Sequence, residues 1–131
     1  MLERERFPRL CQLASIICVI ALVYLSLAPI QLITRTQVLS GREEHWLAYL
    51  LTALFSTLAT GTRGAWVAAG GLVGLAALLE IGQSLSIGRH PAIADFSASA
   101  LGALMGTAVG ALTLVGLRAR AAVSGYRTAK S

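Results

Sequence analysis

Long apolar runs constrain this chain more than any other feature of its sequence. Four runs begin near Leu10, Trp46, Ala65 and Ile93, and most charged residues lie between or outside them. A lipid bilayer offers no hydrogen bonds to the backbone, so runs of this kind are expected to form helices. The chain is 56% hydrophobic and 13% charged, whereas a soluble protein has about 25% charged residues. The sequence therefore predicts one membrane-embedded domain, residues 1–131.

The lengths of the runs predict an all-α, integral membrane four-helix bundle with up-down antiparallel topology. The expected helices are residues 10–29, 42–62, 65–87 and 93–117. The second apolar run alone, Trp46 to Ala59, spans only about 21 Å of a roughly 30 Å hydrocarbon core, so it is extended at both ends. The first run follows a charged head, as in a signal peptide, but it is too long for a typical signal core and favours an uncleaved helix.

The distribution of Lys and Arg predicts the orientation of the bundle. Eight of the 11 basic residues fall in the N-terminal head, the second loop and the tail, and three fall on the opposite side. Cytoplasmic segments carry the excess of basic residues. We therefore expect both termini on the cytoplasmic side of a bacterial inner membrane, with the first and third loops facing outward.

Several other classes of function are disfavoured. The net charge of +5 arises from basic residues at segment ends rather than from one basic helix face, so we expect no nucleic-acid partner. Cys11 and Cys18 share a helix and are too far apart for a disulfide. No metal-ligand spacing occurs, and we expect no metal and no cofactor. The sequence contains no recognisable nucleophile motif or phosphate loop, which leaves catalytic activity open.

A carboxylate inside an apolar segment, Glu80, points to a polar site near the outer face. The predicted topology brings the ends of three helices together around it. A polar stripe is unfavourable against lipid, so these side chains should face the bundle interior. The candidate polar pocket consists of His45, Tyr49, Glu80, Gln83, Arg89, Asp95 and Ser99. An alternative stays open, in which the same cluster is an ion-pair network that fixes the register of the helices.

Two carboxylates in one pocket need a cation or a shared proton between them. We therefore expect Arg89 or His45 to contact Glu80 or Asp95 at hydrogen-bond or ion-pair distance, with Arg42 as a further cation nearby.

Small residues predict where helices approach closely. Glycines recur in small-xxx-small spacing, which permits close backbone contact in membranes; they are Gly70, Gly74, Gly102, Gly106 and Gly110. We expect the third and fourth helices to meet through Gly74 and Gly106.

The segments "EHWLAY" and "EIGQSLSIGRHPAIADFSASALGALMG", together with "YLSLAP", resemble the VanZ-like family over roughly residues 24–110. The residues that match its pattern are His45, Tyr49, Glu80, Gln83, Arg89, Asp95, Gly102 and Gly106. The chain departs from that pattern at Gly41 and Arg42, where an Asp-Lys pair is common, and at Ser99, where an amide is common. The resemblance implies a small multi-helix membrane protein linked to the cell envelope, in a family named for teicoplanin resistance.

Two main functions remain from the sequence. The first is binding of, or action on, a cell-envelope lipid or glycan precursor, with Arg42 and Arg89 holding an anionic group. The second is a non-catalytic interaction or assembly protein that docks partner membrane helices and uses the polar cluster as a structural lock. A proton-coupled transporter is disfavoured because four short helices without an inverted repeat offer little pathway.

Overall fold

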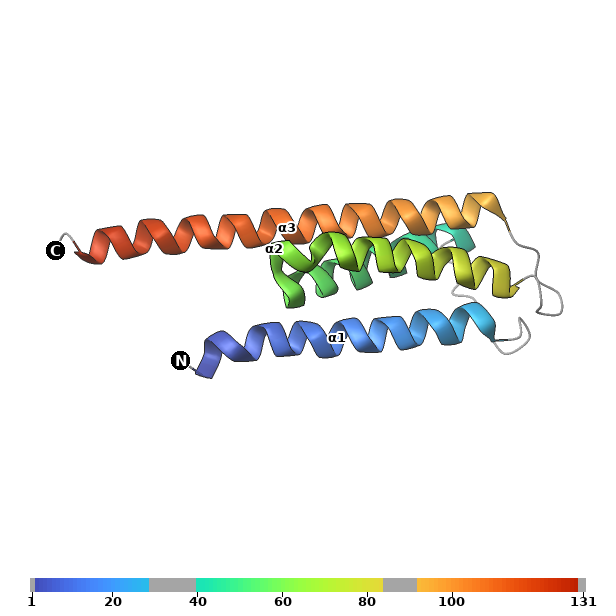
Figure 1. The fold of residues 1–131 in the computed structure, drawn as a ribbon, viewed down its shortest axis with the longest axis horizontal. Coiled ribbons are helices and arrows are strands. Elements are labelled where there is room, and N and C mark those ends of the chain that lie inside the picture. The colour runs from blue at the N-terminus through green and yellow to red at the C-terminus, as the bar shows by residue number, and fades with distance from the viewer. Residues whose placement is uncertain (1, 29–39, 84–91, 130–131) are drawn as a thin grey trace.

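The computed structural model describes residues 2–28, 40–83 and 92–129, which form three α-helices (Figure 1). Helix α1 is Leu2–Leu27, α2 is Gly41–Gln83 and α3 is Ile93–Ala129. The described residues contain no β-strand, so the prediction of an all-helical chain is confirmed. All three helices are long and apolar enough to cross a membrane, by length and composition.

The second and third predicted helices form a single helix, α2, so the structure has three helices where four were expected. Helix α2 is broken at Gly61, whose φ of 77° and ψ of 176° are not helical. Figure 1 shows the chain reversing there, so that the two parts of α2 run in opposite directions. We call residues 41–60 the first arm and residues 62–83 the second arm. Within the described residues each predicted segment is helical apart from Gly61 and Ala28, and one of the expected reversals lies inside a helix.

Two glycines allow this reversal. A positive φ is readily adopted by glycine and is strained for other residues, which explains Gly61. At Gly64 the reason is space, because a Cβ atom there would lie 2.6 Å from Cβ of Thr60. The segment "TGTRG" therefore turns tightly, and Arg63, expected in a loop, lies in the first turn of the second arm.

Two helix ends differ from the prediction. Helix α1 begins at Leu2 rather than residue 10 and contains Pro8, and α3 ends at Ala129 rather than residue 117. Hydropathy identifies the membrane-spanning part of a helix, whereas a formed helix extends through polar residues of good helix propensity such as Arg and Ala. The predicted ends at residues 29 and 87 lie outside the described residues.

Helix α2 is the centre of the arrangement. It packs against both α1 and α3, which do not contact each other within the described part of the chain. The start of α1 and the end of α3 lie at the same end of the molecule (Figure 1). At the opposite end α1 finishes, α2 begins and finishes, and α3 begins. We call this opposite end the polar end.

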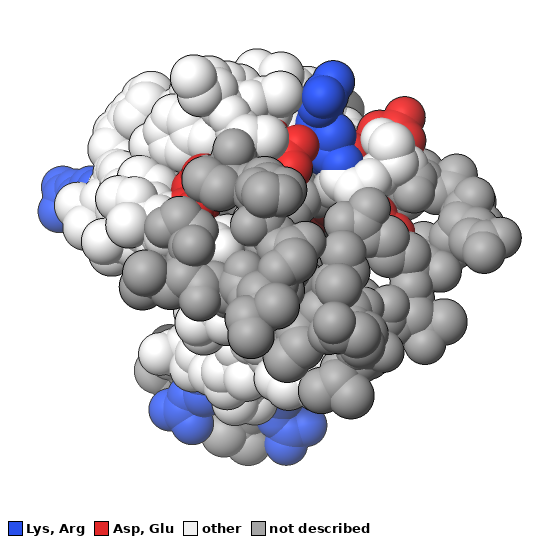
Figure 2. Space-filling model, turned by 90° about the vertical axis from the view of Figure 1, so that its right-hand side faces the viewer, with Lys and Arg blue, Asp and Glu red and all other residues white. Residues whose placement is uncertain are grey.

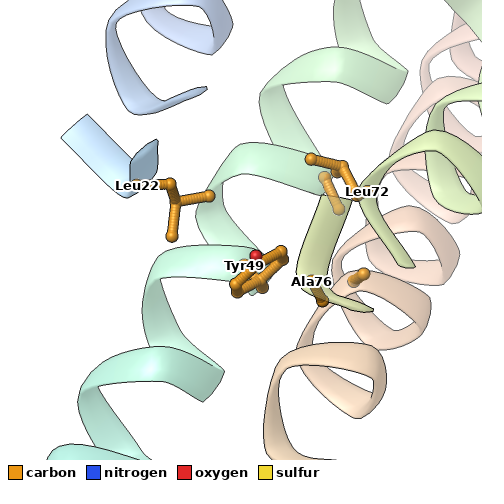
Figure 3. Packing of buried hydrophobic residues seen from close by; sticks show 6 residues of the cluster. Leu22, Tyr49, Leu72 and Ala76 are labelled. Atoms are coloured by element: carbon orange, nitrogen blue, oxygen red, sulfur yellow. The ribbon is translucent and has the colours of Figure 1, made fainter. Parts of the chain in front are cut away.

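The core is small and is built around one aromatic ring. Tyr49 of the first arm is 1% exposed and lies between Leu22 of α1 and Ala76 of the second arm (Figure 3). The remaining buried members of this cluster are Ala53, Leu72 and Ala103. Because the cluster draws on α1, both arms of α2 and α3, it joins all of the helical segments.

Glycines let α3 lie directly on the first arm. A Cβ atom at Gly106 would overlap the carbonyl oxygen of Leu50 and lie 3.0 Å from Cβ of Ala53. At Gly102 it would overlap the carbonyl oxygen of Trp46, and at Gly110 it would lie 2.9 Å from Cβ of Thr57. The three glycines follow one helical face at four-residue spacing, so they hold two backbones in contact along three turns.

The expected contact between Gly74 and Gly106 is wrong. Gly106 packs on the first arm, while Gly70 and Gly74 of the second arm are exposed and a Cβ atom would meet nothing within 4 Å. Spacing shows that glycines share a face of their own helix, but it does not show which neighbouring helix that face meets. Both arms of α2 are apolar and of similar length, so the sequence offered two partners for α3.

The glycine contact predicts a strong asymmetry between two Gly→Ala substitutions. Gly106→Ala should destabilise the fold by about 1–3 kcal/mol or more, because the added methyl overlaps the backbone of the first arm. Gly74→Ala is the matched control and should be neutral or stabilising by up to about 1 kcal/mol, since it adds helix propensity in open space. Denaturant unfolding of both variants in detergent measures this. Equal stability of the two variants would remove the close-contact assignment.

Candidate functional site

The start of α2 is fixed by a capping box. The Ser40 hydroxyl accepts a hydrogen bond from the Glu43 amide at 3.4 Å, and Oε2 of Glu43 accepts bonds from the Ser40 amide at 2.7 Å and hydroxyl at 2.9 Å. These bonds satisfy amides that a helix start leaves without partners. The sequence pattern Ser-x-x-Glu is the signal for this cap, which was not among the predicted features.

Glu80 binds the start of α3. The backbone N–H of Ala92, which directly precedes α3, donates a hydrogen bond to Oε1 of Glu80. The N-terminus of a helix carries a partial positive charge and attracts carboxylates. The carboxylate inside the second arm therefore has a backbone partner, and it ties the end of α2 to the beginning of α3.

Arg42 is the cation that lies beside Asp95. Nε of Arg42 lies 3.7 Å from Oδ1 of Asp95, with the two side chains 64% and 32% exposed. Exposed pairs of this kind contribute only about 0–1 kcal/mol. His45 forms no hydrogen bond or ion pair with any described residue, and Arg89 lies outside the described residues. The expected contact of His45 is thus not seen, and the expectation for Arg89 stays a prediction.

The other candidate residues are divided between the core and the helix surfaces. Tyr49 is buried in the core. Gln83, at the end of α2, is 5% exposed. The Ser99 hydroxyl donates to the carbonyl oxygen of Asp95 at 2.9 Å, which is a bond within its own helix. Of the candidate residues, the structure places Asp95 beside Arg42 and Glu80 against the amide that precedes α3.

The hydroxyl stripe of the first arm, Thr52 and Ser56, mainly serves the helices themselves. Thr52 donates to the carbonyl oxygen of Ala48 and Ser56 to that of Thr52. Only Ser56 reaches another helix among the described hydroxyls of this stripe, because its oxygen lies 2.7 Å from that of Ser15 in α1. These residues therefore position helices, as hydroxyls commonly do in membranes.

A groove of about 450 Å³ opens between the beginnings of α2 and α3. One wall belongs to α2 and consists of Arg42, Glu43 and Trp46. The other wall belongs to α3 and consists of Ala94, Ser97, Ala98 and Leu101. The volume of the groove is in the range of small-ligand sites, and it is a shallow groove that is largely open on one side. Neither Glu80 nor Tyr49 lines this groove, so it differs from the pocket that the sequence predicted. Arg42, which was expected as a cation near that pocket, does line it.

The polar end is acidic among the described residues. Four of the six acidic residues in the chain lie there, at Glu43, Glu44, Glu80 and Asp95, and Arg42 is the basic residue beside them. Figure 2, which faces this end, shows acidic and basic side chains close together. The described residues contain no group of three or more His, Cys, Asp or Glu that could hold a metal ion.

Comparisons with known proteins give no relative for this chain, since no protein-family model, curated protein or solved structure matches it.

The Glu80 contact predicts different results for two substitutions. Glu80→Gln retains an oxygen that can accept from the Ala92 amide and loses only the charge, so it should destabilise by about 0.3–1 kcal/mol. Glu80→Leu leaves that amide without its partner and should cost about 1–3 kcal/mol. Unfolding in detergent measures both, and amide hydrogen exchange should accelerate in the first turn of α3 for Glu80→Leu. If the two variants behave alike, Glu80 does not cap α3.

Proposed function

We propose that this chain is a VanZ-like protein of the bacterial inner membrane that binds a cell-envelope lipid or glycan precursor at its polar end. The groove between α2 and α3 is the observation that carries the proposal. It joins two charged side chains, Arg42 and Glu43, to an apolar wall that includes Trp46 and Leu101. A site of this composition suits a molecule with a polar head and an apolar chain.

The position of the groove supports a ligand that enters from the membrane. Trp46 lies one turn from the start of α2, where an aromatic ring fits the boundary between lipid and water. Leu101 is 53% exposed, so the apolar part of the groove continues onto the outside of α3. An amphipathic molecule could therefore place its head between the helix starts while its chain stays in the bilayer.

The proposed orientation puts this groove on the outer side of the membrane. The distribution of basic residues, eight against three, supports cytoplasmic termini in a four-segment bundle made of α1, the two arms of α2, and α3. A ligand at the polar end would then belong to the outer leaflet or to the envelope.

A non-catalytic assembly role is the second candidate. The bond from the Ala92 amide to Glu80 favours it, because this carboxylate then serves as a lock between α2 and α3 rather than as a ligand contact. The two candidate functions differ in what they require of the groove, because lipid binding needs it and an assembly role does not.

The experiment is to identify lipids that copurify with the full chain, using native mass spectrometry, and to fill the groove. Ala98→Phe places a ring in the groove and should abolish retention of the ligand. Ala108→Phe is the matched control, since it adds the same ring at an exposed position of the same helix outside the groove, and it should retain the ligand. Loss in both variants, or retention in both, would contradict binding in the groove.

A further inference from the structure

The groove carries one charge of each sign on adjacent residues. Arg42 and Glu43 both line it, and they are followed along the first arm by Trp46. A site for a purely anionic head would be expected to collect cations. Here the described residues around Arg42 are acidic, with Asp95 at 3.7 Å and Glu43 next in the chain. The charge pattern therefore fits a head that is itself both positive and negative.

Glu43 is a prearranged acceptor. Its Oε2 receives both bonds of the capping box, from the amide and hydroxyl of Ser40. These two bonds hold the carboxylate in place, while Oε1 accepts no hydrogen bond from a described residue. A fixed carboxylate oxygen at the edge of a groove is suited to an ammonium group, because little side-chain entropy is lost on binding.

Arg42 is the positively charged group of the groove and can bind the negative part of a headgroup. It donates no hydrogen bond at normal distance to a described residue, since its approach to Asp95 is 3.7 Å. Its guanidinium therefore retains donors for a phosphate, and the side chain lies beside Asp95 at the start of α3. Across the groove, the Ser97 hydroxyl donates to the carbonyl oxygen of Ile93, so its own oxygen can still accept from a ligand.

From these contacts we propose that the groove binds a lipid with a zwitterionic phosphate–ammonium headgroup. The phosphate lies against Arg42, the ammonium against Oε1 of Glu43, and an acyl chain follows Trp46 and Leu101. This inference rests on the proposed function and names the lipid class for the same groove. A neutral sugar head would leave both charges unmatched, and an anionic head would lie beside Glu43 and Asp95 with no cation of its own.

The test uses Trp46 as the reporter. The chain has two tryptophans, and Trp66 is 75% exposed and lies outside the groove, so the full chain with Trp66→Phe leaves a single indole. In neutral-detergent micelles it is titrated with dihexanoyl phosphatidylethanolamine, dihexanoyl phosphatidylglycerol and a short-chain glucosyl glycerolipid. We expect a saturable change in Trp46 fluorescence with the ethanolamine lipid. Phosphatidylglycerol should bind about tenfold more weakly, as expected for one lost charged hydrogen bond, and the glucosyl lipid more weakly still, because it lacks both charged groups.

Substitutions of Glu43 and Arg42 test the contacts with the ammonium and the phosphate separately. Glu43→Gln retains the cap, because Gln also closes a capping box. It should bind phosphatidylethanolamine and phosphatidylglycerol about equally, because the contact with the ammonium group is lost. Glu44→Gln is the control, since this neighbouring carboxylate does not line the groove, and it should preserve the preference for phosphatidylethanolamine. Arg42→Gln should weaken both phospholipids and leave their ratio unchanged.

The outcomes distinguish this inference from the function on which it rests. Equal or tighter binding of phosphatidylglycerol or the glucosyl lipid, or identical behaviour of Glu43→Gln and Glu44→Gln, overturns the zwitterionic head but leaves lipid binding in the groove. A saturable response to none of the three lipids, together with no copurifying lipid, overturns both.

Discussion

The reversal of α2 at Gly61 is the constraint on which the rest of the structure depends. A straight helix of 43 residues would be about 64 Å long, more than twice the hydrocarbon thickness of a bilayer. Because the chain turns back at Gly61, both arms fit within one membrane thickness. The same turn brings Tyr49 of the first arm against Ala76 of the second, and it returns Glu80 to the end where α2 began.

The reversal also makes possible the contacts that connect the helices at the polar end. Once the second arm returns, the Glu80 carboxylate meets the amide that precedes α3, and Arg42 at the start of the first arm lies beside Asp95. The glycine face of α3 then fixes the spacing between α3 and the first arm at the backbone. The groove lies where these two helices begin, so its walls are set by the capping box of α2 and by the Glu80 contact.

The sequence predicted the helices better than their partners. Four apolar runs identified the helical segments, and Glu80, singled out as a carboxylate in an apolar run, binds the amide that precedes α3. Glycine spacing identified the face of α3 that makes a close contact, but Gly74 proved exposed, because spacing within one helix carries no information about its neighbour. The partner of Glu80 is a backbone amide, and a search for charged side chains could not find it. The groove combines residues 42–46 with residues 94–101, and only their packing reveals it.

The most direct test of this account measures the distance between the two arms of α2. Leu47 and Leu78 are both exposed, at 38% and 67%, and each can carry a nitroxide spin label through an introduced cysteine after Cys11 and Cys18 are replaced by alanine. With the reversal at Gly61, the arms pack as neighbouring helices and the labels should lie within about 25 Å, since packed helix axes are about 8–10 Å apart. A continuous helix would separate these positions by about 46 Å. Double electron–electron resonance with a main distance near the longer value would contradict the fold and the groove built on it.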